Sequence, residues 1–144
     1  MFSKACEYGI KAMIYIAKQS LSENRVTVND IKEKAGLPAA FTGKVLNALT
    51  KKEIVQSQTG RLGGFYIDIN SMKRIKVIDI VTAIDGNSLF TACGLGLDEC
   101  SSIQPCPMHN KFVIIRKQIK KMLDTTSIYE LALGLKSEKA ILVR

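Results

Sequence analysis

Residues 29–67, NDIKEKAGLPAAFTGKVLNALTKKEIVQSQTGRLGGFYI, decide the fold of this chain. The stretch opens with a short helix, for which Asn29 is the predicted N-cap and Gly36 the stop signal. Pro38 then starts a second helix that continues to about Lys51, because proline is favoured at a first helical position. Two short helices joined by a tight turn that contains glycine are typical of a helix-turn-helix.

A β-hairpin is predicted directly after the second helix. Ile54–Ser57 and Phe65–Ile67 are strand-like, and the turn between them is rich in glycine and carries Arg61. A hairpin in this place is typical of the wing of a winged helix-turn-helix protein. We therefore expect a mainly α fold with a small β-hairpin wing, to which a long dimerisation helix is added.

The second helix is the predicted recognition helix. We expect it to bury Phe41, Val45, Leu46 and Leu49 and to leave Thr42, Gly43, Lys44 and Asn47 on or near its outer face. Such a helix fits a major groove, while Arg61 at the wing tip would reach phosphate or a minor groove. Glycine inside this helix suits either close approach to DNA or tight packing, and both readings stay open. The residues predicted to bind DNA are Lys4, Asn29, Ala39, Ala40, Phe41, Thr42, Lys44, Asn47, Arg61, Gly63 and Gly64.

The rest of the chain is predicted to be helical around one loop. Ser3 caps a helix over Lys4–Gln19, Ile75–Ile84 has helical spacing, and Ser127 begins a short final helix that ends near Gly134. A heptad seam predicts a long helix that pairs with its counterpart in a homodimer. The seam residues are Met108, Phe112, Ile115, Ile119 and Met122. The basic residues beside them, which we expect to form a solvated face, are Lys111, Arg116, Lys117, Lys120 and Lys121.

The predicted organisation is one domain with an appendage. It comprises a DNA-binding domain (1–70), a connecting helix (71–90), a cysteine-rich loop (91–109), the dimerisation helix with a short C-terminal helix (110–136) and a tail (137–144). The 144 residues carry a formal net charge of +8, which attracts polyanions without specifying one. No run of 18 apolar residues occurs, so we expect a cytoplasmic protein without a membrane partner, whose thiols are reduced or metal-bound.

Three of the four cysteines lie in one loop. Six residues separate Cys93 from Cys100, five separate Cys100 from Cys106, and two separate Cys106 from His109. Thiolates gathered on a loop rich in glycine and proline suit an iron–sulfur cluster and also zinc. The alternatives are ordinary buried thiols, or a disulfide with one thiol left over. The absence of a Cys-x-x-Cys motif disfavours zinc and a thiol oxidoreductase, and Cys6 is expected to be a core or near-surface thiol.

Taken together, these motifs resemble the Rrf-two (Rrf2) family of bacterial transcription regulators, of the IscR, NsrR and RirA type. The resemblance rests on Tyr8 and Ala12-Met13, on residues 28–51, on Gly60-x-x-Gly-Gly-Phe65, on Ala83-Ile-Asp85 and on the three spaced cysteines. It implies a dimeric winged-helix protein in which Cys93, Cys100 and Cys106 hold an iron–sulfur cluster. The fourth ligand would be His109, which we prefer, or Glu7 of the partner subunit, and the cluster would be 2Fe-2S or 4Fe-4S.

Two departures from the family pattern matter. The gap between the first two loop cysteines is one residue longer than usual, and the wing has Gly-Arg-Leu-Gly-Gly where many members have a third glycine or a proline. The first departure is one that a glycine-bearing loop absorbs. The second puts inference of the target sequence in doubt more than DNA binding.

The leading functional hypothesis is a dimeric, sequence-specific transcriptional regulator, with repression as the expected effect. Its affinity for a double-stranded operator would be controlled by a cluster that senses redox state, nitric oxide or iron status. The alternative is a cluster-free winged-helix regulator controlled by thiol oxidation, zinc or a partner protein. A small electron-transfer protein is a third reading. An enzyme is not expected, because the single histidine and scattered carboxylates form no obvious acid–base pair.

Overall fold

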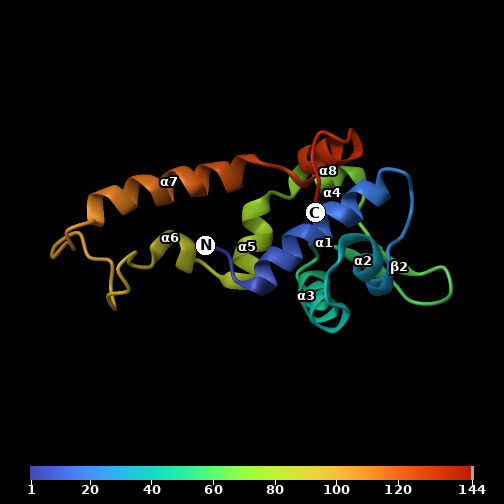
Figure 1. Cartoon of the computed structure of the whole chain (residues 1–144), viewed down its shortest axis with the longest axis horizontal. Helices are drawn as coiled ribbons and strands as arrows, with labels where there is room; N and C mark the ends of the chain where they lie inside the picture. The colour runs from blue at the N-terminus through green and yellow to red at the C-terminus, as the bar shows by residue number, and fades with distance from the viewer. Residues whose placement is uncertain (144) are drawn as a thin grey trace.

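The computed structural model describes residues 1–143, so Arg144, the last residue of the predicted tail, lies outside the described residues. The described chain is mainly helical with one two-stranded antiparallel sheet, as the sequence predicts (Figure 1). Its elements are α1 (Lys4–Ser20), α2 (Val28–Ala35), α3 (Ala39–Lys51), β1 (Gln56–Gln58), β2 (Gly64–Tyr66), α4 (Ile69–Arg74), α5 (Val77–Asp85), α6 (Ser88–Thr91), α7 (His109–Thr125) and α8 (Ile128–Lys136).

The helix-turn-helix is formed by α2 and α3, which pack against α1. The N-cap of α2 is Thr27, and the prediction that Asn29 caps this helix is wrong. The Thr27 hydroxyl accepts from the Asp30 amide at 3.2 Å, and the Asp30 carboxylate accepts from the Thr27 amide at 2.8 Å. This reciprocal pair satisfies two N–H groups at once, so the helix starts one residue before Asn29. Gly36 ends it in the left-handed conformation, as expected.

The recognition helix α3 is rotated relative to the expected orientation. Thr42 is fully buried together with Val45, Leu46 and Leu49, whereas Phe41 is 41% exposed. Positions 42, 45, 46 and 49 follow the i, i+3, i+4, i+7 spacing of one helix face, so both the predicted burial of Phe41 and the predicted outward position of Thr42 are wrong. The Phe41 ring instead packs edge-on against Tyr8 of α1, with 5.6 Å between ring centroids.

The wing is short and is joined to the helical core. Gln56 pairs with Tyr66 and Gln58 with Gly64, so each strand has three residues. Behind the wing, Val26 and Phe65 exchange two backbone hydrogen bonds of 3.0 and 2.7 Å. The segment between α1 and α2 therefore acts as a third, one-residue strand that fixes the wing to the helix-turn-helix.

Three helices occupy the part of the chain where one connecting helix was expected. The chain is extended at Ile75 and Lys76, between α4 and α5, and a similar break separates α7 from α8. The two breaks pair with each other: the Val77 amide donates to the Thr126 carbonyl at 3.0 Å, and the Ile128 amide donates to the Ile75 carbonyl at 3.1 Å. Each break supplies the hydrogen-bond partners that the other lacks, which is why the helices end there.

The helix α7 extends away from the winged-helix body. It packs on α5 and α6, while α8 lies back on α1 and α4. In Figure 1, α6 and α7 run side by side to one end of the molecule, where the cysteine loop joins them, and β2 with the wing lies at the opposite end. Within residues 1–143, no helix is both long and apolar enough to span a membrane.

Candidate functional site

The outer face of α3 and the wing tip form the candidate DNA-binding surface. Ala40, Lys44 and Asn47 are exposed on α3, beside the partly exposed Phe41. Arg61 is exposed at the wing tip, as predicted. Pro38 stands at the N-cap of α3 and provides no side-chain cap among the described residues. The first N–H groups of this helix are therefore oriented as donors for a phosphate or another acceptor.

Two other predicted contact residues make hydrogen bonds within the chain. The Lys4 ammonium pairs with the Glu7 carboxylate at 2.9 Å, and the Asn29 amide donates to Glu33 at 3.1 Å. Both side chains are exposed and lie on α1 and α2 rather than on the recognition helix. Thr42 is buried in the core, so we exclude it from the candidate surface.

The glycines of the wing have a structural role. A Cβ atom at Gly63 would lie 2.1 Å from the Gln58 carbonyl oxygen, and one at Gly64 would lie 2.9 Å from the Val26 carbonyl oxygen. Gly64 also has a φ of 141°, which side-chain-bearing residues rarely adopt. Tight pairing of the wing with its neighbours is therefore sufficient to require glycine at both positions.

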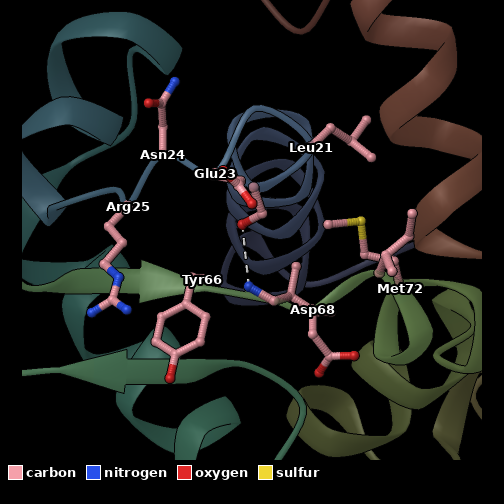
Figure 2. A pocket seen from close by; sticks show the side chains of 10 residues that line it. Leu21, Glu23, Asn24, Arg25, Tyr66, Asp68 and Met72 are labelled. Atoms are coloured by element: carbon pink, nitrogen blue, oxygen red, sulfur yellow. Dashed lines mark hydrogen bonds between the residues drawn. The ribbon is translucent and has the colours of Figure 1, made fainter.

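Sequence reasoning missed Arg25, whose guanidinium lies 4.5 Å from the centre of the Tyr66 ring. This cation–π contact places a fixed positive charge beside the wing. Figure 2 shows the two side chains at the edge of a pocket of about 440 Å³ between the end of α1, β2 and α4. The hydrogen bond drawn there runs from the Ile67 amide to the Ser20 hydroxyl, at 3.1 Å. In the sequence, the one signal for this contact is that Arg25 directly precedes Val26, the residue that pairs with the wing.

The cysteine loop forms two pairs of predicted ligands. The Cys100 sulfur lies 3.4 Å from Nδ1 of His109, the first residue of α7. Hydrogen bonding from the backbone N–H groups of Leu95 and Leu97 lowers the pKa of the Cys93 thiol, and hydrogen bonding with Cys106 lowers it further. The loop thus stabilises a sulfur anion at Cys93 with amide donors, an arrangement that suits a metal-binding thiolate.

The two pairs do not converge on a common point in the isolated chain. Across residues 1–143, no group of three or more histidine, cysteine, aspartate or glutamate side chains is arranged to hold a metal ion. The three thiols of the loop and the imidazole at the start of α7 are donors of the type that holds iron–sulfur clusters. All four cysteines are unpaired by disulfides within the described chain.

Glu7 and Cys6 lie apart from the loop. Glu7 is on α1, where the hydrogen bond from Lys4 lowers the pKa of its carboxyl group. Cys6 is fully buried, as the sequence suggested for a core thiol, and burial, with a smaller contribution from Asp85, raises its pKa to about 12. Asp85 also accepts hydrogen bonds from the amide and hydroxyl of Ser3, and so connects the end of α5 to the start of α1.

One face of α7 holds the cysteine loop. His109 contacts Cys100, and the Phe112 ring lies against Gly94, where a Cβ atom would be 2.5 Å from the ring. Arg116 donates to the Cys100 sulfur at 3.1 Å and to the Ala92 carbonyl. The sequence suggested that Arg116 lies on a solvated face, but its contacts with the loop show that it is only partly solvated. Its partner lies sixteen residues away in a loop, a contact that helical periodicity does not reveal.

The face of α7 turned away from the loop carries three exposed large apolar side chains. Ile114, Ile115 and Met122 are 59%, 50% and 51% exposed. Of the predicted seam, Phe112 faces the loop and Ile119 packs against the core. The seam is therefore divided between two faces of the helix, and we refer to Ile114, Ile115 and Met122 as the α7 stripe.

Comparison with known proteins agrees with this architecture. Residues 2–133 match the Rrf2 family, described as iron-dependent transcriptional regulators. A protein of Aquifex aeolicus assigned to the HTH-type transcriptional regulators is 29% identical over 134 residues, covering 91% of this chain and 90% of its own. The HTH-type transcriptional regulator IscR of Xenorhabdus nematophila is 27% identical over 124 residues, covering 86% of this chain and 74% of its own.

Solved structures show the same fold. CymR, the global cysteine regulator of B. subtilis, superposes with a TM-score of 0.74 at 21% identity, over 92% of this chain and 96% of its own. IscR of T. potens superposes with a TM-score of 0.73 at 22% identity, over 98% of this chain and 92% of its own. Because the family match spans nearly all of the sequence, this protein belongs to the Rrf2 family of transcriptional regulators.

Proposed function

We propose that this transcriptional regulator is a homodimer whose affinity for DNA is controlled by an iron–sulfur cluster on Cys93, Cys100 and Cys106, with His109 as the fourth ligand. The observation that carries the proposal is the pairing of Cys100 with His109 at 3.4 Å, at the point where the cysteine loop joins α7. A thiol and an imidazole from this loop lie next to each other in the chain's own fold. The repressor role and the cytoplasmic location expected from the sequence remain part of the proposal.

DNA recognition is proposed to use α3 and the wing. With Lys44 and Asn47 exposed and the α3 N-terminus without a side-chain cap, this helix has the donors that a major groove and its phosphates accept. Arg61 extends the same basic surface to a flanking phosphate or minor groove. Two copies related by a twofold axis would read a roughly palindromic operator.

His109 is favoured over Glu7 as the fourth ligand. His109 already contacts a predicted ligand, whereas Glu7 is hydrogen-bonded to Lys4 on another helix. A bound cluster supplies a centre that changes with redox state, nitric oxide or iron supply. The residues of the chain would hold it as follows: the loop cysteines bind as thiolates, the amides of Leu95 and Leu97 stabilise the Cys93 sulfur, and α7 holds the loop in place.

Dimerisation is proposed to occur through the α7 stripe. Three large apolar side chains on one uncovered helix face lose contact with water only if another surface covers them. A second copy of α7 presents the same stripe, which is the self-complementary pairing that a twofold axis produces. The pairing would place two cysteine loops and two recognition helices in one assembly.

A cluster-free regulator controlled by thiol oxidation is the second candidate. The lowered pKa of Cys93, to which hydrogen bonding with Cys106 contributes, favours it, because the thiolate is the reactive form of cysteine. Zinc at the same ligands is a further form of this alternative. The metal and sulfide content of anaerobically purified protein distinguishes these possibilities.

The test is anaerobic purification followed by analysis of iron, sulfide and zinc and by visible absorption. We expect a coloured protein with iron and sulfide, and loss of both in Cys93→Ser, Cys100→Ser and Cys106→Ser. Cys6→Ser is the matched control, because Cys6 lies outside the loop, and it should retain the cluster. Colourless protein that contains zinc or no metal would refute the cluster and leave the DNA-binding regulator with thiol or zinc control.

A further inference from the structure

A single side chain of α7 connects the helix to two separate points of the cysteine loop. Arg116 donates one N–H to the Cys100 sulfur, 3.1 Å away, and another to the carbonyl of Ala92, the residue before Cys93. It is half-buried in this position. The contacts therefore fix the first part of the loop, from its start to its second cysteine, against one turn of the helix.

The guanidinium group is suited to this because its geometry is rigid. Its N–H donors lie in one plane with fixed angles, so two acceptors bound to it are held at a fixed separation. Cys100 cannot shift along the loop without displacing either Ala92 or Arg116. An ammonium group has no such fork and acts as a point charge on a flexible chain.

The same helix leads to the rest of the molecule. The α7 stripe lies on the face of α7 turned away from the loop, and α7 packs on α5, which in turn contacts α3. In Figure 1 the cysteine loop lies at the far end of the arm formed by α6 and α7, away from the recognition helix α3. The loop is joined to α6 on one side and to α7 on the other, and α7 offers a route from the loop both to α5 and to a second subunit.

We propose that Arg116 is the positioning residue that couples the cysteine loop to α7. It transfers a displacement of the Cys100 sulfur to the helix that carries the stripe. The coupling half of this inference rests on the proposed control of DNA affinity by the loop, whereas the positioning half requires no bound cluster. Cys100 has two partners on α7, His109 and Arg116, and Arg116 alone of the two also holds Ala92.

The positioning half is tested by amide hydrogen exchange on the metal-free, reduced protein. Arg116→Gln and Arg116→Lys should both accelerate exchange within residues 93–106 by about 10-fold, since neither side chain has the planar fork that holds the Cys100 sulfur and the Ala92 carbonyl together. Lys121→Gln removes the same charge from an exposed position on α7 and should change nothing in the loop. Unchanged exchange of α3 in all variants shows that the fold is intact, and unchanged exchange of the loop in Arg116→Gln would overturn the proposal.

The coupling half is tested by the ratio of DNA affinities of the iron–sulfur-reconstituted and metal-free forms, on a duplex selected from a random pool with the wild-type protein. In Arg116→Gln this ratio should fall toward one, while Lys121→Gln keeps the wild-type ratio. A merely structural defect would weaken both forms equally and leave the ratio unchanged, which would refute the coupling. If the wild-type ratio is itself one, the proposed function fails, and hydrogen exchange alone then decides the positioning role.

Discussion

Thr42 is a buried polar residue whose hydroxyl has no hydrogen-bond partner among residues 1–143. Valine has the same shape without the hydroxyl, so Thr42→Val should raise the free energy of unfolding by about 1 kcal/mol, because the cost of desolvating the hydroxyl is removed. Urea unfolding measures this. DNA affinity should not change, since Thr42 does not face outward.

Thr50→Val is the matched control for Thr42→Val. The Thr50 hydroxyl donates to the Leu46 carbonyl at 2.8 Å on the same helix, so its removal should not stabilise the protein. A loss of stability of about 1 kcal/mol or more in Thr42→Val would contradict the interpretation, because it would mean that the hydroxyl has a partner.

Cys6 differs chemically from the three loop cysteines. Burial raises its pKa from the ordinary 9.0 to about 12, so it stays a neutral thiol in the folded protein. We expect iodoacetamide at about pH 8 to modify Cys93, Cys100 and Cys106 in the native metal-free protein and to spare Cys6 until the chain is unfolded. Mass spectrometry of tryptic peptides checks this, and native modification of Cys6 would contradict it.

The same shift gives a pH dependence with a defined sign. A group whose pKa is raised on folding stabilises the fold fully below its unfolded pKa, and this contribution is lost as the pH rises through the folded value. The stability advantage of the wild type over Cys6→Ala should therefore shrink between pH 9 and pH 12. A constant difference across that alkaline range would refute the assignment.

At the residue scale, the sequence indicates which residues are candidate ligands but not which contacts they make. The candidate loop ligands could be selected because cysteines and a histidine cluster in the sequence. The sequence could not predict that Phe41 faces outward and Thr42 inward, because a shift of one residue along a helix turns each side chain by about 100°. The role of Arg116 depends on where a loop without periodic structure places Cys100, which no local pattern determines.

Among the helices, α3 offers a direct test of what its internal glycine does. A Cβ atom at Gly43 would meet only the Val28 side chain, at 3.9 Å, so tight packing does not require glycine there. Gly43→Ala should stabilise the protein by about 1 kcal/mol through higher helix propensity. Denaturant unfolding measures the gain. Weaker DNA binding by the stabilised variant would show that the glycine serves close approach to DNA.

Gly63→Ala is the contrasting change in the wing. The added Cβ atom would lie 2.1 Å from a backbone oxygen, so β1 and β2 must separate or shift. We expect faster amide exchange in residues 56–66 and reduced DNA affinity, with α3 unchanged. Wild-type exchange in the wing would contradict the packing explanation for this glycine.

The α7 stripe is the element that we expect to form the dimer. Because a twofold interface contains every substitution twice, Ile115→Glu combined with Met122→Glu should bury four unpaired carboxylates and dissociate the dimer. Sedimentation velocity should then give a monomer. Lys120→Glu, an exposed change on the side of α7 away from the stripe, should remain dimeric, and a dimeric double variant would refute the stripe as the interface.

The helices were predictable to different degrees. Caps and periodicity locate α1, α3 and the final helix to within a residue or two. The division of the connecting segment into α4, α5 and α6 was not predictable, because the break at Ile75 is stabilised by pairing with residues 126–128, about fifty positions later. The mixed faces of α7 likewise depend on which elements cover it.

At the scale of the whole molecule, the two candidate functional surfaces lie at a distance from each other. The cysteine loop lies at one end of the arm formed by α6 and α7, and the wing lies at the other end of the molecule (Figure 1). Control of DNA binding therefore requires a change in how two subunits place their recognition helices, or a shift of α7 on α5. A coupling free energy of about 1–3 kcal/mol is enough for such control.

The most direct test of this account is the dissociation constant of the wild-type protein for a duplex selected from a random pool, measured anaerobically with and without the reconstituted cluster at one fixed salt concentration. We predict that the two constants differ by about 10-fold or more, within the range that such coupling produces, and that Cys100→Ser abolishes the difference. Equal constants for the two forms, in a protein that does bind iron and sulfide, would contradict the central claim that the cysteine loop controls DNA binding.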